Sequence, residues 1–380
     1  MPDQSTSTPK YRIGIDARFF RMETGGIGRY TQELVRHLSQ IDVHNDYVVF
    51  ITPADEPEWD TDQPNFRKVV VPARHYSKAE QTIFPRALNR ENLDLVHFLN
   101  FNHPILYRRP FVTTLHDMTM FFHAGGKDSR SKIKLALFRT LFKRAFSRAK
   151  RVIAISEYSA RDAEKHLGIS RSKIDVVYEG GPEAGDEPEN RKAIEEYLGT
   201  ESPYFLFLSQ WRPHKGILTL IDGFNLFKER TGLPHKLVIG GKKNVVLDEV
   251  RERLERSKDI LTPGFVPDDL LTGLYTASTA FVMPSEYEGF GLPVLEAMAA
   301  STATILADNS SLPEVGGDAA LMFPTRDAGA LADRLEQICR EHGLREQLIQ
   351  RGFEQLHKFS WERCAAQTRA TYMRVLEGRS

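Results

Sequence analysis

The chain is organised as a regular alternation of short apolar runs and longer amphipathic segments, a pattern that few architectures accommodate. The periodic segments lie at 27–40, 78–90, 130–149 and 157–167 and are typical of helices. The apolar runs between them are YRIGID (11–16), DYVVFI, RKVVV, DLVHFL, FVTTLH, RVIAIS and IDVVY. Strands rich in Val and Ile that alternate with helices predict a parallel sheet covered on both faces.

The same alternation begins again after a stretch rich in Gly, Pro and acidic residues at 179–190. The strands expected there are YFLFLS (204–209), HKLVIG (235–240), AFVMP (280–284), ATIL (303–306) and ALMF (320–323), and the helices lie near 217–231, 246–257, 292–300 and 327–342. With 380 residues and roughly one domain per 150 residues, we expect two doubly wound α/β domains, 1–182 and 183–360. The segment 344–378 predicts a helix broken near KFSWE, whose last part, 361–380, packs back on the body.

Charge and cysteine content restrict the class of partner. The 51 basic residues balance the 51 acidic ones, which gives no reason to expect nucleic acid. The N-terminus MPDQSTSTPK lacks an apolar core, and no run of about 18 apolar residues exists to span a bilayer, so we expect a cytoplasmic protein. Cys339 and Cys364 show no CxxC spacing, so neither a disulfide framework nor a zinc site is predicted.

A glycine-rich turn follows the first predicted strand. In METGGIGRY, Gly25, Gly26 and Gly28 precede or open an amphipathic helix, whose N-terminus favours an anion. The pattern is GGxG rather than GxGxxG, and no acidic residue ends a second strand about 20 positions on, so it supports dinucleotide binding only weakly. A plain tight turn and a phosphate site both remain open.

Two cations stand where the first strand of the second half ends. In SQWRPHKGIL, Arg212 and Lys215 come just before a helix, and Pro213 fixes the turn. Cations at a helix N-terminus oppose the helix dipole, so an anion that completes the site would explain them. A solvated loop is the alternative.

Two carboxylates flank a glycine-containing turn in SEYEGFGLPVLEAMAA (285–300). Gly289 and Gly291 allow the backbone to approach a ligand, and the N–H groups near Phe290 to Leu292 could face hydroxyls or phosphate oxygens. Glu288 in the loop and Glu296 on the helix could each accept two hydrogen bonds from adjacent hydroxyls of a sugar or a ribose. Helix capping by Glu288 beside a solvated Glu296 is the alternative.

Taken in order, these segments resemble the retaining GT-B glycosyltransferases of family 4. EGFGLPVLE is similar to the E-x7-E signature of that family. The other matching segments are GGIGRY, LHD (115–117), IAISEYSARD (153–162), WRPHKG (211–216), GFVPDDLL (264–271) and SSLPEVGGDAALMF (310–323). The resemblance spans nearly the whole chain and implies the GT-B fold, in which two Rossmann-like domains face a cleft, with the acceptor on the N-terminal side and the donor nucleotide on the C-terminal side.

The resemblance also implies a role for each matching residue. The residues expected at the donor diphosphate are Gly26, Gly28, Arg212 and Lys215. The residues expected at the donor sugar are His116, near the reacting carbon, and Glu288 with the backbone of Phe290, Gly291 and Leu292. Glu296 would hold the ribose, and the backbone of Gly264, Phe265 and Val266 would face the nucleobase.

The implied reaction moves a sugar from a nucleotide-diphosphate donor to a hydroxyl of a glycan or lipid-linked acceptor, with retained anomeric configuration and without a metal. The segments around Glu288 and Ser310 are similar to mannosyltransferases of bacterial surface polysaccharides, so we expect mannose. Two features depart from the family: Gln210 stands where many members have Arg, and ASTA (300–303) stands where many have CGTP. A sugar-nucleotide isomerase and a non-catalytic nucleotide-sugar-binding protein are the alternatives.

Two further segments contain residues of the kind that bind membranes or metals. Ten Lys or Arg residues and one Asp occur in 126–151, with apolar residues at helical spacing, which predicts either an ordinary surface helix or peripheral contact of 127–151 with an anionic membrane. The DTD at 60–62 lies in an acidic loop and not at a strand end, so a solvated loop rather than a metal site is expected there.

Overall fold

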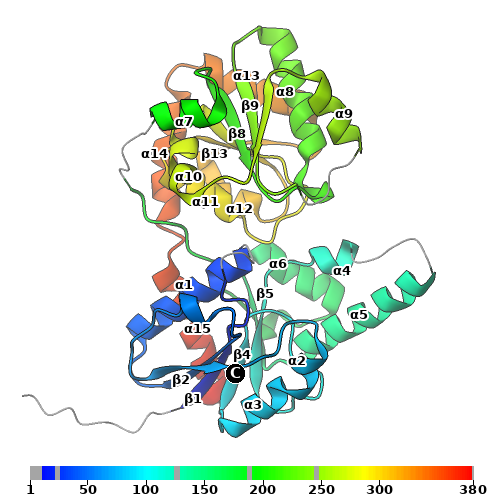
Figure 1. Ribbon diagram of the computed structural model, residues 1–380, viewed down its shortest axis with the longest axis vertical. Helices are drawn as coiled ribbons and strands as arrows, with labels where there is room; N and C mark the ends of the chain where they lie inside the picture. The colour runs from blue at the N-terminus through cyan, green and yellow to red at the C-terminus, as the bar shows by residue number, and fades with distance from the viewer. Residues whose placement is uncertain (1–10, 22–25, 124–128, 186–190, 244–247, 379–380) are drawn as a thin grey trace, which may run out of the picture. The chain divides into compact units, whose positions relative to one another are not determined.

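The computed structural model describes residues 11–21, 26–123, 129–185, 191–243 and 248–378. It divides the chain into unit 1, which comprises Met1–Gly180 and Trp361–Ser380, and unit 2, which comprises Gly181–Ser360. Figure 1 labels many of the helices and strands of both units.

Unit 1 is built on a seven-stranded parallel sheet of order β3-β2-β1-β4-β5-β6-β7. The strands are β1 (Arg12–Asp16), β2 (Asp46–Ile51), β3 (Phe66–Val70), β4 (Leu95–Phe98), β5 (Phe111–Leu115), β6 (Arg151–Ala154) and β7 (Ile174–Val176). The α-helices are α1 (Gly26–Ile41), α2 (Lys78–Thr82), α3 (Phe84–Arg90), α4 (Thr119–His123), α5 (Ser129–Arg148), α6 (Glu157–Asp162) and α15 (Trp361–Leu376).

Unit 2 repeats the plan with a six-stranded parallel sheet of order β10-β9-β8-β11-β12-β13. The strands are β8 (Tyr204–Leu208), β9 (Lys236–Gly240), β10 (Ile260–Gly264), β11 (Ala280–Met283), β12 (Thr304–Ala307) and β13 (Ala320–Phe323). The α-helices are α7 (Arg191–Leu198), α8 (Ile217–Thr231), α9 (Asp248–Arg256), α10 (Asp268–Thr276), α11 (Leu292–Ala299), α12 (Leu312–Gly316), α13 (Ala328–Arg340) and α14 (Leu344–Leu356).

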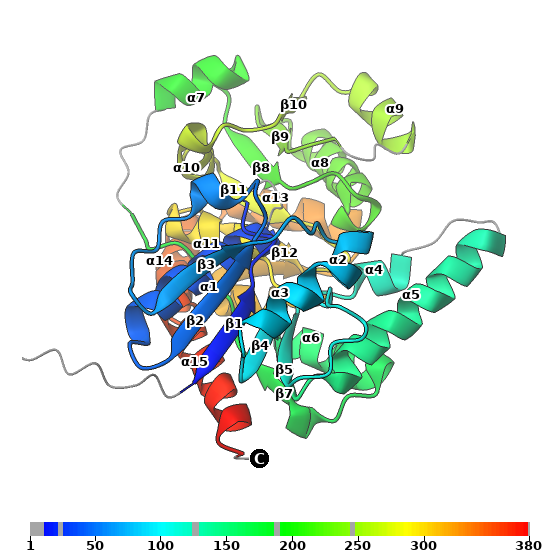
Figure 2. The same ribbon diagram turned by 60° about the horizontal axis from the view of Figure 1, so that its bottom comes forward.

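The two parallel sheets confirm the doubly wound α/β prediction. Central strands such as β5 and β8 are buried along their whole length, as strands with both faces covered must be. The last helix, α15, packs on α1 within unit 1, which confirms that the C-terminal helix returns to the body (Figure 2). Tyr372 anchors it there, with its hydroxyl 2.7 Å from Nδ1 of His97 on β4.

Several helices and one strand of the structure were not predicted from the pattern of apolar residues. The edge strand β10 contains Pro263, which cannot donate to a ladder and is tolerated only at an edge or a bulge, and its pairing with β9 shifts register between Leu261 and Gly264. The short helices α4, α7, α10 and α12 were also not expected. The segment 78–90 forms two helices rather than one, because Ile83 ends α2 and Pro85 lies in the first turn of α3.

Candidate functional site

At the C-terminal edge of the unit 2 sheet, an ion pair joins two of the segments singled out in the sequence. Lys215 ends a 3-10 turn, Pro213–Lys215, that follows β8, and Glu288 lies in the loop after β11. The Lys215 Nζ donates to Oε1 of Glu288 at 2.7 Å, and both side chains are largely buried, at 15% and 11% exposed. An ammonium has three donors, so Lys215 can bind a further anion while it keeps this contact.

The backbone around Lys215 requires glycine. Gly216, the N-cap residue of α8, has φ of 68°, and a Cβ built there would lie 2.0 Å from the carbonyl oxygen of Pro284. The neighbouring amide of Glu286 donates to the carbonyl of His214 at 2.8 Å. The loops after β8 and β11 therefore lie against each other, and this brings Lys215 and Glu288 together.

A serine pair holds the Glu288 loop in place. The amide of Glu288 donates to Oγ of Ser310 at 3.0 Å. The hydroxyl of Ser311 lies 3.2 Å from the carbonyl of Glu288 and donates to that of Phe290 at 2.6 Å. Ser310 itself has φ of 55°, a conformation that few non-glycine residues adopt. From the sequence, SSLPEVGG was predicted only to be a segment that resembles the family. The structure shows that its two serines support the Glu288 loop.

The N-terminus of α11 presents backbone donors beside Glu288. Gly291, its N-cap residue, has φ of 119°, and Pro293 occupies the first turn, where its missing N–H is no loss. In the part of the chain that the structure describes, the amides of Gly291 and Leu292 have no acceptor. Phe290 is buried and packs edge-on against Phe359, with ring centroids 5.6 Å apart. The turn thus exposes backbone rather than the aromatic side chain.

Glu296 lies one turn further along α11 and is not simply a solvated helix residue. Its Oε2 accepts a hydrogen bond of 3.0 Å from the hydroxyl of Tyr275, which is itself only 1% exposed on α10. A buried tyrosine therefore fixes the direction of this carboxylate. No motif in the sequence pointed to Tyr275.

Arg212, unlike the largely buried Lys215, lies at the surface. It is exposed, and its Nη2 donates to the side chain of Gln210 at 3.1 Å. It also lines a cavity of about 50 Å³ at the N-terminus of α8, together with Trp211 and Thr219. The indole Nε1 of Trp211, completely buried, has no hydrogen-bond partner among the described residues. Helix N–H groups, a cation and an indole N–H suit a small anion.

The segment expected at the nucleobase is partly engaged by the protein itself. The carbonyl of Gly264 accepts from the amide of Gly241 at 2.6 Å, and the carbonyl of Phe265 accepts from the hydroxyl of Tyr197 at 3.2 Å. The side chain of Phe265 is 64% exposed, whereas Val266 is buried. The exposed surface of this segment is therefore mainly the Phe265 ring.

In unit 1, His116 follows β5 and is 8% exposed. Its Nε2 lies 2.8 Å from the carbonyl of Leu99, and its Nδ1 lies 3.3 Å from Oε1 of Glu179. Glu179, which the sequence did not identify, is also buried. Both ring nitrogens of His116 are therefore already in contact with acceptors, the Leu99 carbonyl and the Glu179 carboxylate.

The Cys364 thiol lies near Glu179. Burial, with a smaller contribution from the Glu179 charge, raises the pKa of this thiol.

The glycine turn of unit 1 is described only from Gly26, the first residue of α1, onward; Gly25 lies outside the described residues. Gly28 is buried within the first turn of α1. Both glycines therefore lie in the first turn of α1, and their contact with a diphosphate stays a prediction.

The basic segment forms α5 from Ser129 onward; residues 127 and 128 lie outside the described residues, and so do the side chains of 129–134. Over the described part, Phe142, Ala145, Phe146 and Ala149 are buried against the body of unit 1. Lys143, Arg144 and Lys150 are exposed, as is Leu137 at 59%. The apolar face of this half of the helix is therefore part of the unit 1 core.

Neither a membrane span nor a metal cluster is found in the described ranges. No helix there combines the length and apolar character that crossing a bilayer requires. No group of three or more His, Cys, Asp or Glu residues among them could hold a metal ion. Asp60 and Asp62 of the DTD sequence are exposed.

Two family patterns match consecutive parts of the chain. The pattern described as "Glycosyltransferase Family 4" matches residues 24–180, and that described as "Glycosyl transferases group 1" matches residues 187–355. Among individual proteins, the chain is 29% identical over 371 residues to the O-antigen chain mannosyltransferase B of Escherichia coli, covering 91% of this chain and 95% of that protein. It is 28% identical over 240 residues to the O-antigen chain mannosyltransferase RfbU of Salmonella typhimurium, covering 62% and 63%.

Solved structures share the fold at lower sequence identity. A glycosyltransferase from Rickettsia africae superimposes with a TM-score of 0.73 at 17% identity, covering 98% of this chain and 100% of the other. Anabaena HepE, solved in complex with UDP and glucose, superimposes with a TM-score of 0.71 at 16% identity, covering 95% and 99%.

Proposed function

The chain belongs to the group 1, family 4 glycosyltransferases of GT-B fold, and from this membership we propose that it is a retaining mannosyltransferase. It would move mannose from a nucleotide-diphosphate donor to a hydroxyl of a glycan or lipid-linked acceptor in surface polysaccharide or glycolipid synthesis. The choice of mannose is supported by the resemblance to two O-antigen mannosyltransferases, one of them over nearly the full length of both chains.

The Lys215–Glu288 pair is the observation on which the proposed donor site rests. This cation and carboxylate lie with the backbone amides of Gly291 and Leu292 at the carboxyl ends of the unit 2 strands. Ligands bind at this end of the sheet in parallel α/β proteins. A nucleotide-diphosphate sugar offers each of these groups a partner: phosphate oxygens for the cation and amides, and sugar hydroxyls for Glu288.

We assign the remaining roles on the same basis. The cations Lys215 and Arg212 neutralise the charge of the diphosphate as it leaves. Arg212 does so from the cavity that it lines at the N-terminus of α8. Glu296, oriented by Tyr275, accepts hydrogen bonds from the two ribose hydroxyls. The nucleobase lies against the segment Gly264–Val266, whose exposed surface is the Phe265 ring. In unit 1 the proposal keeps Gly26 and Gly28 for the diphosphate and His116 for the sugar.

In this proposal no protein side chain acts as the catalytic base. The C1–O bond to the diphosphate breaks, and the acceptor oxygen bonds to C1 on the same face. The departing phosphate oxygen takes the acceptor's proton. The role of the chain is to hold the donor and to stabilise the negative charge that develops on the leaving group, which preorganised cations do best.

Donor hydrolysis and transfer across a panel of GDP-, UDP- and ADP-sugars test the proposal, with mannose, glucose and galactose donors each assayed with EDTA and with Mg²⁺. We expect GDP-mannose to be the donor consumed, at rates that EDTA leaves unchanged. Consumption of another donor would overturn the choice of mannose, and conversion of a donor to an isomer without an acceptor would overturn the transfer reaction itself.

The cellular setting is part of the proposal. A nucleotide-sugar donor is made from a nucleoside triphosphate and is a cytoplasmic metabolite. An acceptor that is linked to lipid lies at a membrane. We therefore place the enzyme in the cytoplasm, with peripheral contact to anionic lipid through the cations of α5.

A further inference from the structure

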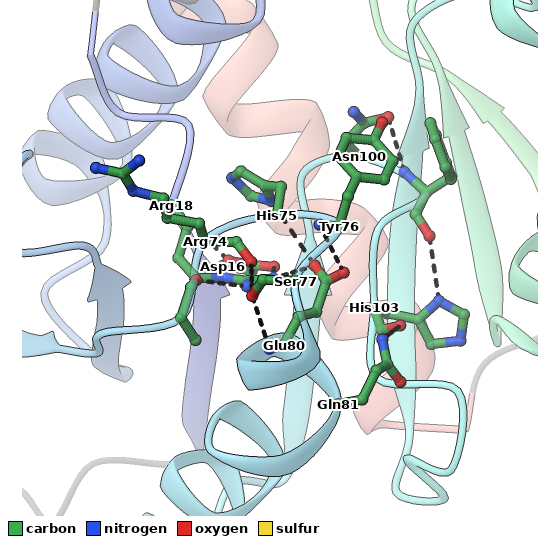
Figure 3. A network of polar contacts seen from close by, with 12 residues as sticks. Asp16, Arg18, Arg74, His75, Tyr76, Ser77, Glu80, Gln81, Asn100 and His103 are labelled. Carbon is green, nitrogen blue, oxygen red and sulfur yellow. Dashed lines mark hydrogen bonds and ion pairs between the residues drawn. The ribbon is translucent and has the colours of Figure 1, made fainter.

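A second group of residues, at the C-terminal edge of the unit 1 sheet, plays no part in the proposed donor site. In parallel α/β sheets ligands bind where the strand order reverses, and in unit 1 this point lies between β1 and β4. The loops that follow β1, β3 and β4 come together there, and Figure 3 shows their polar residues. The amide of Ile105, for example, donates to the side chain of Gln81 on α2 at 2.8 Å.

Arg18 ties two of these loops together. Its guanidinium donates to both carboxylate oxygens of Asp16, at 2.7 and 2.8 Å, to Glu80 at 3.0 Å and to the carbonyl of Ala73 at 2.9 Å. The Arg18 side chain has no exposed surface and lies 3.8 Å from the centre of the Phe84 ring. A charge so buried and so fully paired fixes the position of Glu80.

Glu80 in turn holds Tyr76 in an unusual conformation. Its second oxygen accepts a hydrogen bond of 3.1 Å from the Tyr76 amide (Figure 3). Tyr76 has φ of 58°, in the left-handed region that a bulky residue rarely adopts, yet its side chain is 60% exposed. Strain of this kind persists only where the surroundings impose it, and it is concentrated at functional sites. Here a strained backbone presents an aromatic ring to solvent.

The neighbours of Tyr76 combine apolar surface with polar atoms. Its ring centroid lies 6.1 Å from that of Phe101, and its hydroxyl lies 3.8 Å from Sδ of Met120, which is 43% exposed. The preceding residue, His75, stacks on Phe19; its Nδ1 lies 3.8 Å from Oε1 of Glu80, and both of its ring nitrogens are buried. Oδ1 of Asn102 is buried as well. An exposed aromatic face of this kind suits the C–H face of a sugar ring.

We propose that Tyr76 is the platform on which a sugar ring of the acceptor stacks. This inference rests on the proposed function, because the glycan nature of the acceptor comes from it. It assigns to Tyr76 a part in acceptor selection that neither the sequence motifs nor the relatives indicated. The Arg18–Glu80 pair acts only as a positioning device, since Arg18 is inaccessible.

Substitutions at Tyr76 separate this role from a structural one. Asparagine tolerates the left-handed region and lacks the ring, so the melting temperature of Tyr76→Asn should be no lower than that of wild type. With GDP-mannose as donor and a fluorescently tagged mannobiose as acceptor, Tyr76→Asn should raise the acceptor KM about tenfold relative to the donor KM, as expected for the loss of one aromatic contact. Tyr76→Phe keeps the ring and should stay within about threefold of wild type. Leu106→Asn, at an exposed residue of the same unit, is the matched control.

The outcomes distinguish this inference from the proposed function. An acceptor KM that Tyr76→Asn leaves unchanged, or one that rises only together with the donor KM, would overturn the role of Tyr76. If wild type consumes no sugar nucleotide, the proposed function fails first. Saturation-transfer NMR of mannobiose on wild type and Tyr76→Asn then tests the platform alone, and a signal that does not depend on Tyr76, or no signal, would overturn it.

Discussion

At the scale of single residues, the site depends on side chains that the sequence could identify and on partners that it could not. Lys215, Glu288 and Glu296 stand in recognisable motifs. Tyr275 and the two serines at 310 and 311 reach the site from other elements, and only the folded chain shows which carboxylate or carbonyl each contacts. Partners of this kind are separated by about 20 residues in sequence, so no local pattern records them.

Lys215 and Glu296 should differ in the kinetic constant that they affect. Lys215→Ala removes a preorganised charge from the leaving group, and we expect kcat to fall by roughly 100- to 1000-fold. Glu296→Ala removes hydrogen bonds made equally in the ground and transition states, so donor KM should rise by about tenfold with kcat little changed. Steady-state kinetics with GDP-mannose measure both. Wild-type kinetics in both variants would refute the site assignment, and urea unfolding of each checks that the fold is intact.

At the scale of elements, the parallel strands followed from composition, and the departures have local causes. The Val- and Ile-rich runs predicted the central strands because strands buried on both faces must be apolar throughout. Strand β10 was not predicted because it contains Pro263, which is rare in strands. The helices α7, α10 and α12 were not predicted because helices this short are stabilised mainly by tertiary packing. His116 was predicted from the end of β5, but its contact with Glu179 depends on how β5 and the segment after β7 pack.

The turn between β8 and α8 gives a prediction for Gly216. A Cβ there would meet the Pro284 carbonyl oxygen at 2.0 Å in addition to the strain of a positive φ. Gly216→Ala should therefore lower the free energy of unfolding by about 3 kcal/mol or more, measured by urea denaturation. Gly199 has the same φ of 68° with no atom within 4 Å of a built Cβ, so Gly199→Ala should lose only about 1 kcal/mol. Equal losses in both would show that the Pro284 contact is unimportant.

Helix α5 gives a prediction about membranes. Its buried residues Phe142 and Phe146 pack into unit 1, whereas Lys143 and Arg144 are exposed and available to a lipid surface. We expect co-sedimentation with vesicles containing anionic phospholipid, decreasing as salt rises, since each cation contributes about 1 kcal/mol at such a surface. Lys143→Glu with Arg144→Glu should weaken it. Binding that is the same on neutral vesicles would contradict an electrostatic contact.

At the scale of the whole molecule, acid should destabilise the fold through histidines whose pKa burial lowers, among them His97 in unit 1 and His235 in unit 2. His97 in unit 1 is fully buried between Tyr372 and Thr114, and burial, with a smaller effect of His116, lowers its pKa to about 3. His235 in unit 2 has a pKa lowered to about 4 by burial, with a smaller effect of Lys228. Both imidazoles are therefore neutral in the folded state at pH values where an unfolded chain would protonate them.

The sign of the effect follows from proton linkage. Between about pH 6.5 and the folded-state pKa, the unfolded chain binds a proton that the folded one does not, so the free energy of unfolding falls as pH falls. The fully buried His97 contributes up to about 1.4 kcal/mol per pH unit in this window. For His97 the loss is spread over pH 6.5 to about 3. Because His97 joins β4 to α15, protonation should release the C-terminal helix first.

Hydrogen exchange measured by mass spectrometry between pH 7 and pH 4, corrected for the intrinsic pH dependence of exchange, tests this in peptides from β4 and α15. In wild type their protection should decrease progressively below about pH 6.5. In His97→Gln, which keeps polar contacts but cannot titrate, protection should be lower at pH 7 and vary less with pH. His44→Gln, at an exposed histidine of the same unit, should retain the wild-type dependence. A dependence in His97→Gln as steep as that of wild type would show that another group titrates, the next to examine being His103, whose pKa burial also lowers.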